Sequence, residues 1–152
     1  MPVTTQQAPA SANATRANLG FLLAKASQRW NELLHTHFSE HGFGEVRPAY
    51  GSLLLPLFEE DGLRMGELAR RARLAKQTMT TMVRLLERDG LVRRETDPED
   101  GHATRIYLTE RSRSFRPIAE RVLRELEQLV TESVGARRVR QLAIDLKEVS
   151  DL

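Results

Sequence analysis

The amino-acid sequence predicts a mainly α-helical protein with one small β-hairpin. Apolar residues recur at helical spacing along most of the 152 residues. Gly90 follows the clearest of these periodic segments, and two short segments with strand character come after it. The letters DPEDG between the two strands indicate a charged turn. We therefore expect helices on both sides of a single hairpin.

The first predicted helix runs from about Ala14 to His41. Asn13 is a candidate cap at its start, and glycines 42 and 44 follow its end. Its apolar face is formed by Leu19, Leu22, Leu23, Ala26, Trp30, Leu33, Leu34, His37 and His41. Residues 1–13 have neither the basic lead nor the apolar stretch of a secretory signal, so we expect a flexible polar tail there.

The middle of the chain predicts three further helices and the hairpin. Pro48 should open one helix, which Pro56 should bend or end. Residues 64–94 read as helix, short turn, helix and strand, and the second of these helices spans residues 76–89. Its core-facing residues are Met79, Met82, Val83 and Leu86. The two strands are expected at residues 91–94 and 104–109.

Two amphipathic helices are predicted after the hairpin. The first contains Phe115, Ile118, Val122, Leu126, Leu129 and Val130, and it tolerates Pro117 only near its start. The second contains Val139, Leu142, Ala143, Leu146 and Val149. The helices at both ends of the chain have apolar stripes that need a partner. We expect a homodimer, and the alternative is a helical cap on a monomer.

Charge is concentrated in residues 64–94, which hold nine Lys or Arg and three Asp or Glu. This segment therefore carries a net charge of +6 in a chain of net charge +2, and the remaining residues are net acidic. A basic face on an otherwise acidic protein is typical of proteins that bind polyanions. Because the basic segment includes a helix-turn-helix pattern, we expect double-stranded DNA as the partner.

The second helix of this segment presents side chains suited to base contacts. Its outward face carries Gln77, Thr81, Arg84 and Arg88, with Thr78 and Thr80 on the flanks. Arg pairs with guanine, Gln pairs with adenine, and Thr offers a hydroxyl and a methyl group in the major groove. An ordinary solvated helix face is the alternative interpretation.

The chain resembles the MarR family of bacterial transcriptional regulators from about Pro48 to Arg113. The motifs DGLVRR, DPED and YLTE occur in the family's order and spacing. Members are winged helix-turn-helix homodimers that bind pseudo-palindromic operators and are often released by small aromatic or phenolic ligands. The resemblance implies a DNA-binding region at 47–109 and a helical dimerisation region at 14–46 and 110–152. The implied function is that of a repressor, with DNA-binding candidates at Arg70, Arg71, Arg73, Lys76, Gln77, Thr78, Thr80, Thr81, Arg84, Arg88, Arg94, His102 and Arg105.

Two positions depart from the family pattern. Many members have an arginine pair where this chain has Gly101 and His102, so we expect the minor-groove arginine and its ion pair with Asp97 or Asp100 to be missing. Arg105 is the nearby replacement candidate, and His102 would attract a narrow minor groove only when protonated. Ala75 stands where a capping side chain is usual, which leaves a helix amide for a DNA phosphate.

Two weaker sites involve the first helices. His37 and His41 are spaced like zinc ligands on a helix, although histidines on an apolar stripe also serve as packing residues. Trp30, His37 and Tyr50 could line an aromatic ligand pocket, or they could belong to the core. These sites leave open a zinc-responsive regulator of the same fold. A winged helix that contacts protein or RNA is the rival from another class.

Several classes of protein are excluded or unsupported by the sequence. No cysteine is present, which excludes disulfides and thiolate metal ligands. No apolar run is long enough to cross a membrane. No nucleophile elbow, phosphate-binding glycine loop or metalloprotease motif occurs. We therefore expect a cytoplasmic protein that is not an enzyme and needs no cofactor.

Overall fold

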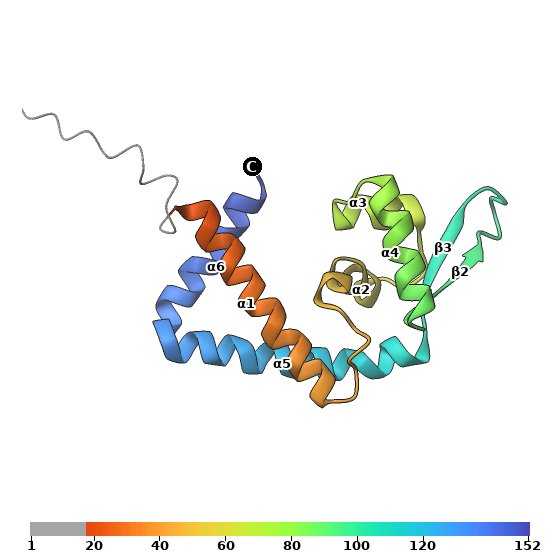
Figure 1. Cartoon of the computed structure of the whole chain (residues 1–152). Helices are drawn as coiled ribbons and strands as arrows, with labels where there is room; N and C mark the ends of the chain where they lie inside the picture. The colour runs from red at the N-terminus through yellow and green to blue at the C-terminus, as the bar shows by residue number, and fades with distance from the viewer. Residues whose placement is uncertain (1–17) are drawn as a thin grey trace, which may run out of the picture. The chain divides into compact units, whose positions relative to one another are not determined.

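The computed structural model describes residues 18–152, which divide into two units after Leu33. The predicted tail, the cap at Asn13 and the helix start at Ala14 lie outside the described residues. Helix α1 spans Leu19–Glu40 (Figure 1), and the Asn18 side chain accepts a hydrogen bond of 2.8 Å from the Phe21 amide. This bond satisfies one of the free amides at the helix start.

The end of α1 packs through a residue that the predicted stripe omitted. Leu34 and Phe38 are its buried residues, and the Phe38 ring meets the Phe115 ring edge to face with centroids 4.8 Å apart. His37 is only partly exposed and His41 is exposed. The predicted stripe was therefore wrong at its end, where Phe38 rather than His41 continues the core-facing side.

Pro48 opens a short 3-10 turn, Pro48–Tyr50, that leads into α2, Gly51–Glu59. Pro56 lies inside α2, and the helix continues past it to Glu59. Of the two predicted effects of Pro56, a bend or an end of the helix, the end was therefore wrong. Proline at this position removes only the bond to the carbonyl of Ser52, an exposed residue in the first turn of the helix.

The central part of the chain forms the two helices and the sheet shown in Figure 1. Strand β1 is Leu63–Arg64, α3 is Met65–Ala72, α4 is Lys76–Arg88, β2 is Val92–Thr96 and β3 is Thr104–Leu108. The sheet is antiparallel in the order β1-β3-β2. Strand β1 was not predicted, and it pairs Leu63 with Ile106. The core beneath these elements contains Leu53, Leu57, Leu68, Met79, Leu86, Leu91 and Ile106.

Helix α5, Glu110–Val134, begins with a reciprocal cap. The Thr109 hydroxyl accepts from the Ser112 amide, the Ser112 hydroxyl accepts from the Thr109 amide, and Thr109 also donates to the Gly90 carbonyl at 2.6 Å. These contacts fix the start of α5 against the end of α4. Pro117 lies in the third turn, so the expectation that it falls near the helix start was wrong.

Helix α6, Ala136–Ser150, follows α5 after Gly135 and has no buried residue. Its apolar side chains remain open, with Leu142 45% exposed, Ile144 54%, Leu146 41% and Val149 42%. Among residues 18–152, no helix combines the length and the apolar character needed to span a bilayer.

Candidate nucleic-acid interface

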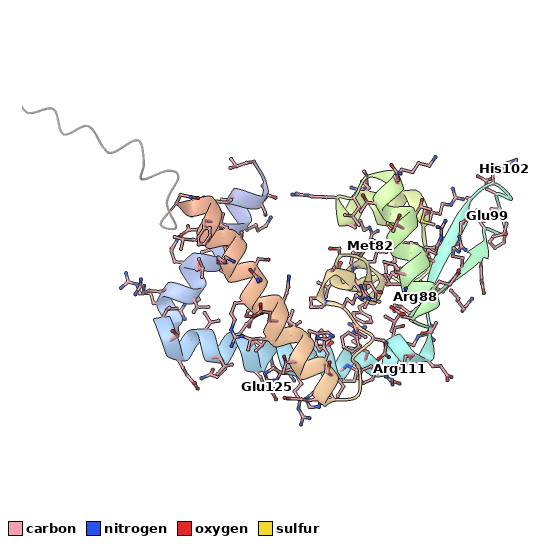
Figure 2. The ribbon with its side chains drawn as sticks, viewed as in Figure 1. Met82, Arg88, Glu99, His102, Arg111 and Glu125 are labelled. Carbon is pink, nitrogen blue, oxygen red and sulfur yellow. The ribbon has the colours of Figure 1, made fainter. Side chains whose placement is uncertain are left out.

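Helix α4 separates a buried face from a polar outward face. Met79, Val83 and Leu86 are buried, and Met82, labelled in Figure 2, is partly exposed. The predicted outward residues are all exposed, namely Gln77, Thr78, Thr80, Thr81, Arg84 and Arg88. The helical period therefore assigned the two faces of α4 correctly.

Some outward side chains of α4 already make hydrogen bonds within the protein, and others make none among the described residues. The hydroxyl groups of Thr80 and Thr81 donate to the carbonyls of Lys76 and Gln77, so the protons of both hydroxyl groups are already in use. Within the described part of the chain, the side chains of Lys76, Gln77 and Arg84 make no hydrogen bond or ion pair. Donors of this kind are available to a ligand without breaking an internal contact.

The two ends of α4 are held differently. Ala75 provides no side-chain cap at the start, as predicted. At the other end, Asp89 accepts from the buried Tyr50 hydroxyl at 2.5 Å and from Arg88 at 3.1 Å. The hydrogen bonds from Arg88 and Tyr50 lower the pKa of Asp89. Tyr50 therefore anchors the end of α4 from within the core.

The arginines of α3 are paired with carboxylates in the structure. Glu67 accepts from Arg70 and Arg71, and Arg71 also donates to Glu60 at 2.6 Å. The hydrogen bonds to Glu67 lower its pKa to about 2. Arg71 is thus shared between two carboxylates, whereas the Arg70 side chain stays 72% exposed.

Arg73 and Arg94 are paired too. Arg73 adopts the left-handed conformation at the end of α3, with φ 53°. Its guanidinium donates to the Ser150 carbonyl at 2.8 Å and to Asp151 at 3.0 Å. Arg94 of β2 forms a two-pronged ion pair with Glu87 of α4, with both distances 3.0 Å. Much of the predicted positive charge is therefore balanced locally.

The base of the hairpin is organised around one buried carboxylate. The Asp97 side chain is fully buried, and its Oδ2 accepts from Arg64 Nε at 2.7 Å and from Arg105 Nε at 2.9 Å. Its Oδ1 accepts from the Glu99 amide at 2.8 Å. The hydrogen bond from that amide, together with the two guanidinium groups, lowers the pKa of Asp97.

The turn supplies no arginine to Asp97, as expected, and two arginines from elsewhere in the sheet pair with it instead. The partners come from β1 and β3 rather than from the turn, and Arg105 also donates to the Gly62 carbonyl at 2.8 Å. The Arg105 guanidinium is thereby held at the base of the hairpin. His102 lies in the turn at the hairpin tip (Figure 2), where its amide donates to Asp100 at 3.0 Å.

The candidate ligand and metal residues differ in their surroundings. Tyr50 is 1% exposed and belongs to the core. His37 Nδ1 lies 3.8 Å from Glu125, and Trp30 belongs to the first unit of the chain. Residues 18–152 contain no group of three His, Asp or Glu side chains placed to hold a metal ion.

Comparison with known proteins agrees with this geometry. The MarR family model matches residues 49–104. The HTH-type transcriptional repressor Rv2887 of Mycobacterium tuberculosis is 34% identical over 85 residues, which are 56% of this chain and 61% of that protein. The chain spans less than two thirds of the length of the curated relatives it matches.

Solved structures show the same fold. The PcaV regulator of Streptomyces coelicolor, in complex with its natural ligand, is 24% identical with a TM-score of 0.76, covering 91% of this chain and 94% of that one. The regulator MosR of M. tuberculosis, in complex with DNA, is 25% identical with a TM-score of 0.67, covering 88% and 96%. Both proteins are transcriptional regulators. Residues 49–104 therefore match the MarR family model, and the chain has the winged helix-turn-helix fold of these regulators.

Proposed function

We propose that this protein is a homodimeric transcriptional repressor that binds a pseudo-palindromic operator in double-stranded DNA. The observation that carries the proposal is the outward face of α4, where Gln77 and Arg84 are exposed and unpaired within the described residues. The repressor Rv2887 and the DNA complex of MosR support this assignment. A winged helix for protein or RNA contact is the rival, and it would show no preference for a DNA sequence.

In this proposal, α4 contacts the DNA bases, and the start of α4 and nearby arginines contact the phosphates. Arg84 and Gln77 have the donors that recognise guanine and adenine edges in a major groove. Lys76 and the uncapped start of α4 offer a charge and free amides to a phosphate. Four further arginines have exposed side chains, so DNA phosphates can replace their carboxylate partners. They are Arg70, Arg73, Arg88 and Arg94.

The open apolar side chains of α6 supply the dimer contact in this proposal. Two copies would present two α4 helices to half-sites about one helical turn apart, which accounts for a pseudo-palindrome. The proposal also includes a small-molecule effector, by analogy with the PcaV regulator, whose structure contains its natural ligand.

DNA recognition is tested by selecting duplexes from a random library and measuring affinity by fluorescence anisotropy. Arg84→Ala and Gln77→Ala should each cost about 1 to 3 kcal/mol on the selected operator and much less on random duplex. Arg124→Ala is the matched control, because Arg124 is an exposed arginine of α5 without an ion pair in the described chain. Equal losses for Arg84→Ala on both duplexes would refute base readout, and failure to select any sequence would favour the rival.

We also propose that a small aromatic or phenolic compound releases the repressor. Such a ligand must bind the free protein more tightly than the DNA-bound protein, since only a difference in affinity shifts the equilibrium. Trp30 is the only tryptophan of the chain and reports binding near α1. Phenols, aromatic acids and zinc should be titrated against tryptophan fluorescence and operator binding. Release by zinc alone, reversed by a chelator, would support the zinc-responsive alternative instead.

A further inference from the structure

The tip of the hairpin carries negative charge in the domain that binds DNA in the proposed function. Between Glu95 and Thr104 the sequence contains no Lys or Arg. Glu99 and Asp100 are exposed in the turn, and His102 is the basic side chain beside them. The stick view in Figure 2 places Glu99 and His102 at the far end of the hairpin.

The arginines closest to the hairpin tip already form ion pairs with other residues. Arg64 and Arg105 both bind the buried Asp97 at the hairpin base. Arg93 is paired with Glu95 and lies over the Tyr107 ring, with its Cζ 4.6 Å from the centroid. The hairpin therefore cannot bring an arginine to its tip without breaking an existing ion pair.

The turn itself is held in one arrangement by its own hydrogen bonds. The Asp97 amide donates to the Ala103 carbonyl at 2.9 Å, and the Ala103 amide donates to the Asp100 carbonyl at 3.0 Å. The Glu99 amide donates to the Asp97 side chain at 2.8 Å. These bonds keep Glu99 and Asp100 at the tip. Even with a protonated His102, residues 98–102 would carry a net charge of −1.

We propose that Glu99 and Asp100 keep the wing tip out of the minor groove and so limit sequence recognition to the major-groove contacts of α4. A narrow minor groove has an enhanced negative potential that attracts cationic side chains and repels carboxylates. The operator should then show no preference for A·T pairs where the wing lies. This proposal rests on the DNA-binding function proposed above and adds which part of the domain determines specificity.

The first test removes the two charges with near-isosteric changes. Glu99→Gln combined with Asp100→Asn should raise affinity for operator and random duplex about three- to tenfold near 50 mM salt, and the gain should shrink at higher salt. Both side chains are exposed, and the asparagine introduced at position 100 keeps an oxygen for the His102 amide. The control, Glu127→Gln combined with Glu132→Gln, makes the same change in net charge on exposed residues of α5, outside the hairpin and outside α6, and should change affinity little.

The second test restores the missing cations. Gly101→Arg combined with His102→Arg fits sterically, because nothing lies within 4 Å of an added Cβ at Gly101. In the wild-type background, these two arginines should raise affinity for DNA only slightly. In the Glu99→Gln, Asp100→Asn background the gain should exceed about tenfold and depend on A·T content in the flanking minor groove, with new hydroxyl-radical protection there.

The outcomes separate this proposal from the proposed function. If the wild type selects an operator but the wing variants match the control, or if removing the carboxylates lowers affinity, the wing proposal is wrong and the DNA-binding function stands. Hydroxyl-radical protection of the flanking minor groove by the wild type would also overturn it. If the wild type binds no duplex at all, both are overturned.

Discussion

Leu142→Glu should convert the protein from a dimer to a monomer. Leu142, Ile144, Leu146 and Val149 of α6 are all between 41% and 54% exposed in the single chain, although they are apolar. A glutamate placed in the contact that covers them would lose its hydration without gaining a partner. Because a dimer binds its second half-site as an intramolecular event, affinity for a two-half-site operator should fall about 100-fold or more.

Light scattering at micromolar concentration measures the mass, and anisotropy measures operator affinity. Gln141→Glu is the matched control, since it introduces the same charge on the polar side of α6, beside Asp145. It should remain dimeric. A monomeric wild type, or a Leu142→Glu variant that stays dimeric, would show that α6 does not hold the two copies together.

The parts of the fold that follow from local periodicity were predictable. The buried and outward faces of α4, its uncapped start and the hairpin after Gly90 were all expected from the sequence. A 3.6-residue repeat and a turn signal are properties of neighbouring residues, so one sequence contains them. Strand β1 has only Leu63 and Arg64, which is too short for an alternating pattern to appear.

The polar contacts of the interface could not be predicted in the same way. Arg64 and Asp97 are 33 residues apart in the sequence, and only the pairing of β1 with β3 brings them together. Arg73 with Asp151 and Tyr50 with Asp89 are also distant in the sequence. Charge counting identified the basic segment, but the three-dimensional fold decides which of its cations are already paired.

The two prolines inside helices show another limit of predicting structure from sequence. We expected Pro56 to bend or end its helix, yet α2 continues past it to Glu59. Pro117 likewise lies inside α5, where it removes the bond to the Arg113 carbonyl. A helix held by buried residues on both sides, such as Phe115 and Ala119 around Pro117, can absorb one missing hydrogen bond. The helix-breaking tendency of proline, judged from neighbouring residues alone, contains no information about that packing.

Asp97→Asn should destabilise the domain more than any other single amide replacement in the hairpin. The substitution removes the charge that balances Arg64 and Arg105, while the side chain is completely buried. Breaking such a pair leaves guanidinium groups without compensation, and we expect the melting temperature to fall by roughly 5 °C. Asp100→Asn, three residues along the same turn, is the control and should melt close to the wild type.

The pH dependence of stability gives this prediction a second measurement. Because the pKa of Asp97 is lowered in the folded state, its contribution is present above the unfolded pKa of about 4 and is lost as the pH falls through the folded pKa. Asp97→Asn should therefore lower the melting temperature at pH 7 and flatten its decline below about pH 4. Glu67, Glu87 and Asp89 also have lowered pKa values, so part of the decline should remain. Equal melting curves for Asp97→Asn and Asp100→Asn at both pH values would show that the buried carboxylate does not stabilise the base of the wing.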